Sequence, residues 1–252
     1  MLRVVKTELV KLKRYFIFWI GASLMLLTVL LTLFTSMAED GIVWDYPFLW
    51  EQVVKNLFTL TFPMCIALVA GYMIDRETKD NTLKNIVTVP VSFRKLMAGK
   101  LIVAGLLSVL LGAVCYGFTV AASLLLGYEG LRWAVVPGDL LQGCMLTLLL
   151  YITVLPIVIA VSRLGSGFLA GVILAFVYGF IGMFAKVPYP TLCVLGLVGY
   201  RSGAEGVYWN KPLCGAVVGA LALLSVLMIG CAQKPGDEKR AAKKGAVPKK
   251  GW

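Results

Sequence analysis

The apolar positions of this chain gather into six long runs and do not alternate with polar positions. The runs cover residues 15–35, 57–74, 101–126, 140–161, 165–185 and 212–232. A helix needs about 20 apolar residues to cross about 30 Å of hydrocarbon, and every run is close to that length. The pattern therefore predicts an all-α integral membrane protein, with six transmembrane helices in one domain over residues 1–232.

Residues 1–14 precede the first run and are amphipathic. Four leucine and valine residues follow one another at helical steps of three or four, and most basic residues lie on other faces. The apolar residues are Leu2, Val5, Leu9 and Leu12. This pattern predicts an N-terminal amphipathic helix that lies in the membrane interface and leads into the first span.

Residues 75–100 form the only long charged stretch between two apolar runs. A short helix is predicted between a polar capping residue, Asp80 or Asn81, and Pro90, which ends it. Ser92 can then cap the helix of the third span. The apolar face of the short helix consists of Leu83, Ile86 and Val87. Two interpretations stay open: a docking surface for a cytosolic partner, or a linker whose apolar residues rest on the membrane.

A stretch before the sixth run interrupts the series. Pro188 and Pro190 prevent the fifth helix from continuing, and the apolar residues 191–200 are too few to span a membrane. We therefore expect an outer half-helix before the sixth span. Cys193 and Cys214 both fall on the outer side, where they either form a disulfide or remain thiols.

Small residues recur at helical spacing in the fifth and sixth runs. They are Gly167, Gly171, Ala175, Gly179, Gly215 and Gly219. Such stripes let two helices approach closely. The approaching helix belongs either to a second subunit or to the same bundle, and the spacing alone favours neither alternative.

The distribution of charge indicates the orientation. The chain has 24 Lys and Arg residues, and 19 of them lie in residues 1–14, 75–100 and 233–252 or at Arg163. Positive charge is biased toward the cytoplasm, so both termini are predicted to be cytoplasmic. The net charge of +11 is then explained by orientation and anionic lipid rather than by nucleic acid. Residues 233–252 form a basic tail that we expect to be disordered in the cytosol.

The predicted outer loop, residues 36–52, has four acidic residues and no Lys or Arg. It either attracts cationic substrates or is simply the segment that the positive-inside bias leaves outside.

Several classes of chemistry are excluded by residue type. The chain has no histidine, no pair of cysteines separated by two other residues and no phosphate-binding loop with its lysine. No acidic residue lies in the middle of an apolar run, so a proton or sodium relay is not expected. We predict a non-catalytic protein with no catalytic, cofactor-binding or metal-binding residues, and any active transport would draw its energy from another polypeptide.

The charged stretch also resembles a pattern in six-span permeases of the ABC-2 type. The residues that carry the resemblance are Glu77, Thr82, Pro90, Ser92, Arg94 and Lys100. Phe93 departs from the pattern, because many members have the basic residue directly after the serine. The amphipathic start and the outer half-helix are similar as well, so the resemblance covers most of the chain.

The resemblance implies that the short helix between spans two and three is a cytoplasmic coupling helix, which docks on a separate ATPase subunit. The residues implied in this coupling are Glu77, Thr82, Leu83, Ile86, Val87 and Pro90. ATP and Mg²⁺ would be bound by a dimer of that ATPase and not by this chain. A second permease copy or a paralogue would complete the transporter.

Within the family, the size of the chain and its short outer loops look most like the lantibiotic-immunity and bacitracin-resistance permeases. This implies an exporter in a bacterial cytoplasmic membrane that expels a peptide antibiotic or another amphipathic substrate. The alternative is a membrane anchor or sensor that recruits a cytosolic protein without transport. A channel is disfavoured because no ring of polar residues recurs along any span.

Overall fold

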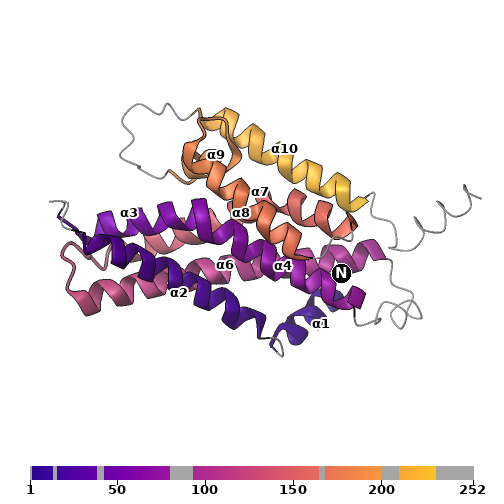
Figure 1. Ribbon diagram of the computed structural model, residues 1–252, viewed down its shortest axis with the longest axis horizontal. Coiled ribbons are helices and arrows are strands. Elements are labelled where there is room, and N and C mark those ends of the chain that lie inside the picture. The colour runs from indigo at the N-terminus through magenta and orange to yellow at the C-terminus, as the bar shows by residue number, and fades with distance from the viewer. Residues whose placement is uncertain are drawn as a thin grey trace, which may run out of the picture.

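The computed structural model describes residues 2–13, 16–38, 43–79, 93–164, 168–199 and 210–230, and these ranges are mostly helical (Figure 1). Within them there is no β-strand, in agreement with the all-α prediction. The elements are α1 (Leu2–Lys13), α2 (Ile17–Ser36), α3 (Tyr46–Asn56), the π-helical turn η1 (Leu57–Thr61), α4 (Phe62–Lys79), α6 (Phe93–Leu126), α7 (Val136–Leu164), α8 (Phe168–Phe184), α9 (Pro190–Val198) and α10 (Lys211–Gly230).

The long helices run side by side in one elongated bundle with two distinct ends (Figure 1). At one end, α1 packs against α6 near the point where α4 stops and α6 starts; we call this the α1 end. At the other end, the backbone N–H of Tyr46 in α3 donates to the carbonyl of Glu129 in the connection between α6 and α7, at 2.8 Å. We call this the α3 end.

Five helices are long and apolar enough to cross a membrane: Ile17–Ser36, Tyr46–Ile74, Leu96–Leu126, Val136–Ser162 and Lys211–Gly230. They correspond to five of the six predicted spans. The predicted span over residues 165–185 contains α8, an apolar helix of 17 residues, which is about 26 Å long at 1.5 Å per residue. The structure thus supports a membrane-embedded helical protein, and the six-span topology stays a prediction.

The prediction of an outer loop over residues 36–52 is wrong for the second half of this segment, which belongs to the helix α3 (Tyr46–Asn56). Asp45 starts α3 by accepting a hydrogen bond from the Phe48 backbone N–H at 2.9 Å. Trp50 of α3 is buried in the bundle and packs edge-on against Tyr116, with ring centroids 5.1 Å apart. Burial of this apolar face makes α3 continuous with the second span.

The predicted half-helix before the last span is present as α9. Pro190 occupies its first turn, where a missing N–H costs no helical hydrogen bond. Gly199 ends the helix with a φ of +73°, in the left-handed region that glycine adopts readily. The third span is also longer than a membrane requires, because α6 extends over 34 residues.

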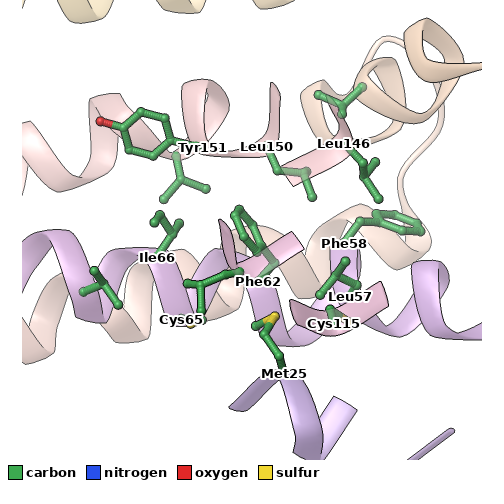
Figure 2. Close-up of a cluster of buried hydrophobic side chains, with 14 of the residues drawn as sticks. Met25, Leu57, Phe58, Phe62, Cys65, Ile66, Cys115, Leu146, Leu150 and Tyr151 are labelled. Atoms are coloured by element: carbon green, nitrogen blue, oxygen red, sulfur yellow. The ribbon is translucent and has the colours of Figure 1, made fainter. Parts of the chain in front are cut away.

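The core of the bundle lies where η1 and α4 meet α2, α6 and α7. Fully buried side chains from all of these elements interlock there (Figure 2), among them Met25, Leu57, Phe62, Cys115 and Leu150. In Tyr46–Ile74, 67% of the most apolar stretch is buried, compared with 17% in α10. The second span is therefore the central helix, and α10 is peripheral.

The central span contains one break in its helical pattern. Pro63 has no N–H, so the Thr59 carbonyl cannot receive the usual bond from the residue four positions later. The preceding residues form η1, in which the Phe62 N–H donates to the carbonyl of Leu57, five residues back. The Thr59 hydroxyl donates a hydrogen bond to the Lys55 carbonyl, four residues earlier, at 2.7 Å.

The small residues of α8 lie against the central span and α7 of the same chain. Gly171 faces Val161, Ala175 is fully buried, and Gly179 lies directly against the Thr59 carbonyl and Pro63. Gly179 has no Cβ, so α8 can approach the π-helical turn η1 closely. The described part of the stripe thus packs inside one bundle.

The other small residues have different surroundings. Gly167 lies outside the described residues. Gly215 and Gly219 face away from the bundle: a Cβ on Gly219 would meet no heavy atom within 4 Å, and one on Gly215 would meet only Leu197, at 4.0 Å.

We predict opposite effects for alanine at Gly179 and Gly219. Alanine favours a helix over glycine by about 1 kcal/mol, but at Gly179 its Cβ would collide with the Thr59 backbone carbonyl, and overpacking costs roughly 1–3 kcal/mol. Gly179→Ala should lower the thermal unfolding midpoint of the detergent-purified protein, and Gly219→Ala, the matched control, should not. A midpoint for Gly179→Ala at or above wild type would contradict the close packing of α8 on η1.

Candidate functional site at the α1 end of the bundle

Most of the predicted coupling residues lie outside the described residues: Thr82, Leu83, Ile86, Val87 and Pro90. Glu77 lies in the last turns of α4, where the structure describes the backbone only. What the structure does describe are the two flanks of this segment, α4 up to Lys79 and α6 from Phe93 onward. The candidate site is the junction that holds these flanks.

The junction is built around Lys100, in the second turn of α6. Its Nζ lies 3.4 Å from Oε2 of Glu8 in α1. The same Nζ donates a hydrogen bond to the backbone carbonyl of Met73 in α4, at 2.7 Å. A single ammonium group therefore connects three elements: the N-terminal helix and both flanks of residues 80–92.

The pair is shielded from solvent. The side chains of Lys100 and Glu8 are only 6% and 4% exposed. Removing charges from water costs several kcal/mol per ion, and this cost is offset only when the groups are well paired and hydrogen-bonded. Loss of one partner leaves the other as a buried, uncompensated charge, which typically costs about 3–5 kcal/mol.

The structure shows which residues of α1 face the bundle. Glu8 points into the bundle and Val5 is half-buried, whereas Leu9 and Val10 are 43% and 66% exposed. The amphipathic pattern grouped Val5 with Leu9 on one apolar face and gave Glu8 no role. One signal could have found it: Glu8 is the only acidic residue in the basic segment 1–14.

Apolar and polar contacts brace the junction from the side of α7. The Tyr151 hydroxyl donates to the Leu101 carbonyl, one residue after Lys100, at 2.6 Å. A small cluster of buried residues, Met97, Leu101 and Ile159, packs against Ile74 and the end of α10. The α1 end is thus stabilised by the Glu8–Lys100 ion pair and by a local hydrophobic cluster.

The α3 end is closed by a different polar network. The Tyr46 hydroxyl donates to Oδ2 of Asp139 at 3.1 Å and lies 2.9 Å from the Tyr116 hydroxyl. Ser36 and Tyr128 add a second contact between their hydroxyl groups, at 2.7 Å. These bonds connect α3, α6 and α7, so the acidic residue Asp139 stabilises the packing at this end.

Among the described residues, no group of His, Cys, Asp and Glu could hold a metal ion. What the geometry of the α1 end does provide is a polar connection, through Lys100, between α1 and the two helices that flank residues 80–92.

Comparison with protein families gives one match. Residues 4–182 match the family model described as ABC-2 family transporter protein, which covers well over half of the chain. The matched region includes α1, the junction and residues 80–92. No curated protein and no solved structure matches the chain at a significant level.

The stability of the junction can be tested by removing its charges singly and together. Lys100→Met and Glu8→Met should each lower the thermal unfolding midpoint, because each removes one partner of a buried ion pair, at a cost of about 3–5 kcal/mol. The double variant Glu8→Met with Lys100→Met should lose less than the sum of the two single losses, because the same ion pair is broken in all three variants.

Lys6→Met is the matched control, since Lys6 lies on the exposed side of the same helix. If the double variant instead lost the sum of the two single losses, Glu8 and Lys100 would be independent and the junction would not exist as described.

Proposed function

Because the chain belongs to the ABC-2 family of transporter proteins, we propose that it is the membrane-spanning permease subunit of an ATP-driven exporter. Its apolar helices form the membrane part. ATP and Mg²⁺ bind to a separate ATPase subunit, in keeping with the absence of a phosphate-binding loop from this sequence. The chain itself is then not an enzyme, and it converts the movement of its partner into movement of the spans.

The observation that carries this proposal is the connection through Lys100. A partner that binds the predicted coupling residues Leu83, Ile86 and Val87 displaces residues 80–92 as it closes on ATP. The two helices that flank the segment, α4 and α6, are joined by the bond from Lys100 to the Met73 carbonyl, and Glu8 adds α1, so the displacement passes to α4, α6 and α1 together. Glu77 and Thr82 shape the start of the segment, and Pro90 ends its helix.

The distribution of charge supports the orientation that this function requires. The segments rich in Lys and Arg include residues 1–14, 75–100 and 233–252, and the positive-inside bias puts them in the cytosol. The α1 end then faces the ATPase, and the α3 end faces the outside of a bacterial cytoplasmic membrane. Lys6 on the exposed side of α1 lies where anionic headgroups would meet it.

A second permease copy or a paralogue completes the translocation path. Support comes from α10, which is the least buried of the five long helices. Gly215 and Gly219 lie on its open side, where another helix could approach closely. Two permeases with an ATPase dimer give each ATPase one set of residues 80–92 to bind.

The substrate is a peptide antibiotic of the lantibiotic type or a comparable amphipathic molecule, and its expulsion protects the cell. The support is the resemblance to permeases of immunity and resistance systems. The acidic residues of the outer segment are divided between two roles. Asp45 caps α3 and Glu51 lies within α3, while Glu39 and Asp40, outside the described residues, are the two proposed to attract a cationic peptide.

The decisive experiment is co-purification of the tagged full chain from its native cells in mild detergent, with identification of the bound proteins. An ATPase with a phosphate-binding loop should be recovered with the wild type and lost with Leu83→Asp, because a charge would then occupy the apolar docking face. Asn85→Asp is the matched control, since Asn85 lies on the opposite face of the predicted helix.

Recovery of the ATPase with Leu83→Asp would show that residues 80–92 are not the docking site. Recovery of a kinase or a protease in place of an ATPase would favour a membrane anchor or sensor and would overturn the exporter.

A further inference from the structure

The half-helix α9 packs against the start of α10, and each helix carries a cysteine as its fourth residue, Cys193 and Cys214. Backbone hydrogen bonds hold both residues in the first helical turn. Cys193 N–H donates to the Tyr189 carbonyl at 3.0 Å, and Cys214 N–H donates to the Asn210 carbonyl at 2.9 Å. The first turns of two neighbouring helices thus bring their cysteines to the same place.

Both side chains are buried where α9 and α10 pack together. Cys193 and Cys214 are free thiols with no exposed surface, and the nearby Cys214 contributes to the raised pKa of the Cys193 thiol. The packing of α9 on α10 thus places the two thiols as neighbours.

A second pair of thiols shows why the position matters. Cys65 and Cys115 are also fully buried and interact with each other. They lie in the central core, surrounded by the long helices (Figure 2). Cys214, by contrast, is one turn from the exposed Lys211 at the start of α10. Cys193 lies on a nine-residue helix that contacts α10, α7 and α8, whereas Cys65 and Cys115 are enclosed by the long helices of the central core.

We propose that Cys193 and Cys214 are a modification site, a dithiol that is oxidised to a disulfide joining α9 to α10. The oxidant is a small disulfide or the oxidised form of a thiol–disulfide exchange protein. One cysteine thiolate attacks the S–S bond of the oxidant, releases one thiol and forms a mixed disulfide; the second thiolate then displaces the other thiol. Each cysteine loses a proton, and the two electrons reduce the oxidant to two thiols.

The packed pair is protected from reaction. Burial, together with the neighbouring Cys214, raises the pKa of the Cys193 thiol to about 12. The Cys193 thiol is therefore protonated at neutral pH while the helices are packed, and a protonated thiol is a poor nucleophile. Oxidation proceeds when α9 separates from α10, and the disulfide then joins the first turns of two helices that already pack against each other.

The disulfide restricts the α3 end. It closes a loop over residues 194–213 and fixes α9 to the last span. The inference rests on the proposed orientation, in which this end faces the outside, where disulfides persist.

The test uses the full chain with Cys231→Ser, because Cys231 would share a tryptic peptide with Cys214. The purified protein is treated with 4,4′-dithiodipyridine, warmed to just below its unfolding midpoint, denatured and alkylated. Cleavage after Arg201 then separates the two cysteines unless a disulfide joins their peptides. We expect mass spectrometry to show the joined peptides, their loss on reduction, and a higher unfolding midpoint for the oxidised protein.

Cys193→Ala is the matched control and should give neither the joined peptides nor the rise in midpoint. Cys65 and Cys115 should stay unlinked in the same sample. Recovery of Cys193 and Cys214 as separate alkylated peptides after warming would overturn the proposal. A link that forms in the purified chain, but not in intact cells treated with a membrane-impermeant disulfide, would support the dithiol and overturn the orientation.

Discussion

The buried pair of Glu8 and Lys100 is the constraint on which the α1 end depends. Lipid is as apolar as the side chains of a membrane helix, so apolar contacts alone do little to fix where one helix sits relative to another. A shielded ammonium group that must satisfy both a carboxylate and a backbone carbonyl tolerates far fewer arrangements. The position of α1 on α6, and the spacing between α4 and α6, therefore follow from one charged side chain.

The rest of the bundle has polar contacts at its ends and apolar packing between them. At the α3 end, Tyr46, Tyr116 and Asp139 connect three helices by hydrogen bonds. The described core between the ends is mainly apolar, and threonine hydroxyls such as those of Thr119 and Thr153 bond to carbonyls of their own helices. Within the described residues, the one π-helical turn lies in this middle region, at η1. A span that is fixed at both ends bends most readily where its hydrogen-bond pattern is already interrupted.

The sequence predicted the membrane class, five of the long helices and the half-helix α9, because length and apolar character are local properties. It did not predict α3 or the burial of Trp50, because a mixed polar and aromatic segment has the same residue pattern whether it contacts water or other helices. The role of Glu8 was missed for a related reason: the amphipathic pattern of α1 does not show that its acidic residue meets a lysine some ninety positions later. Gly179 and Gly219 have the same spacing signal, yet only the first is packed inside the bundle. In each of these cases, contacts with residues distant in the sequence determine the structure, and a local pattern does not show them.

The contacts also divide the bundle mechanically under the proposed function. Lys100 joins α1, α4 and α6, and α4 and α6 are the helices that flank residues 80–92 in the sequence; α2 follows because it packs along α6. The last span packs mainly on α7 and α9, and its end contacts the α1 end at the cluster around Ile159. A displacement of residues 80–92 would therefore move the first three spans more than the last one. The boundary between the two groups runs along α7, which holds α6 through the bond from Tyr151 to the Leu101 carbonyl. Through that bond, movement of the first three spans would be either transmitted to α7 or resisted by it.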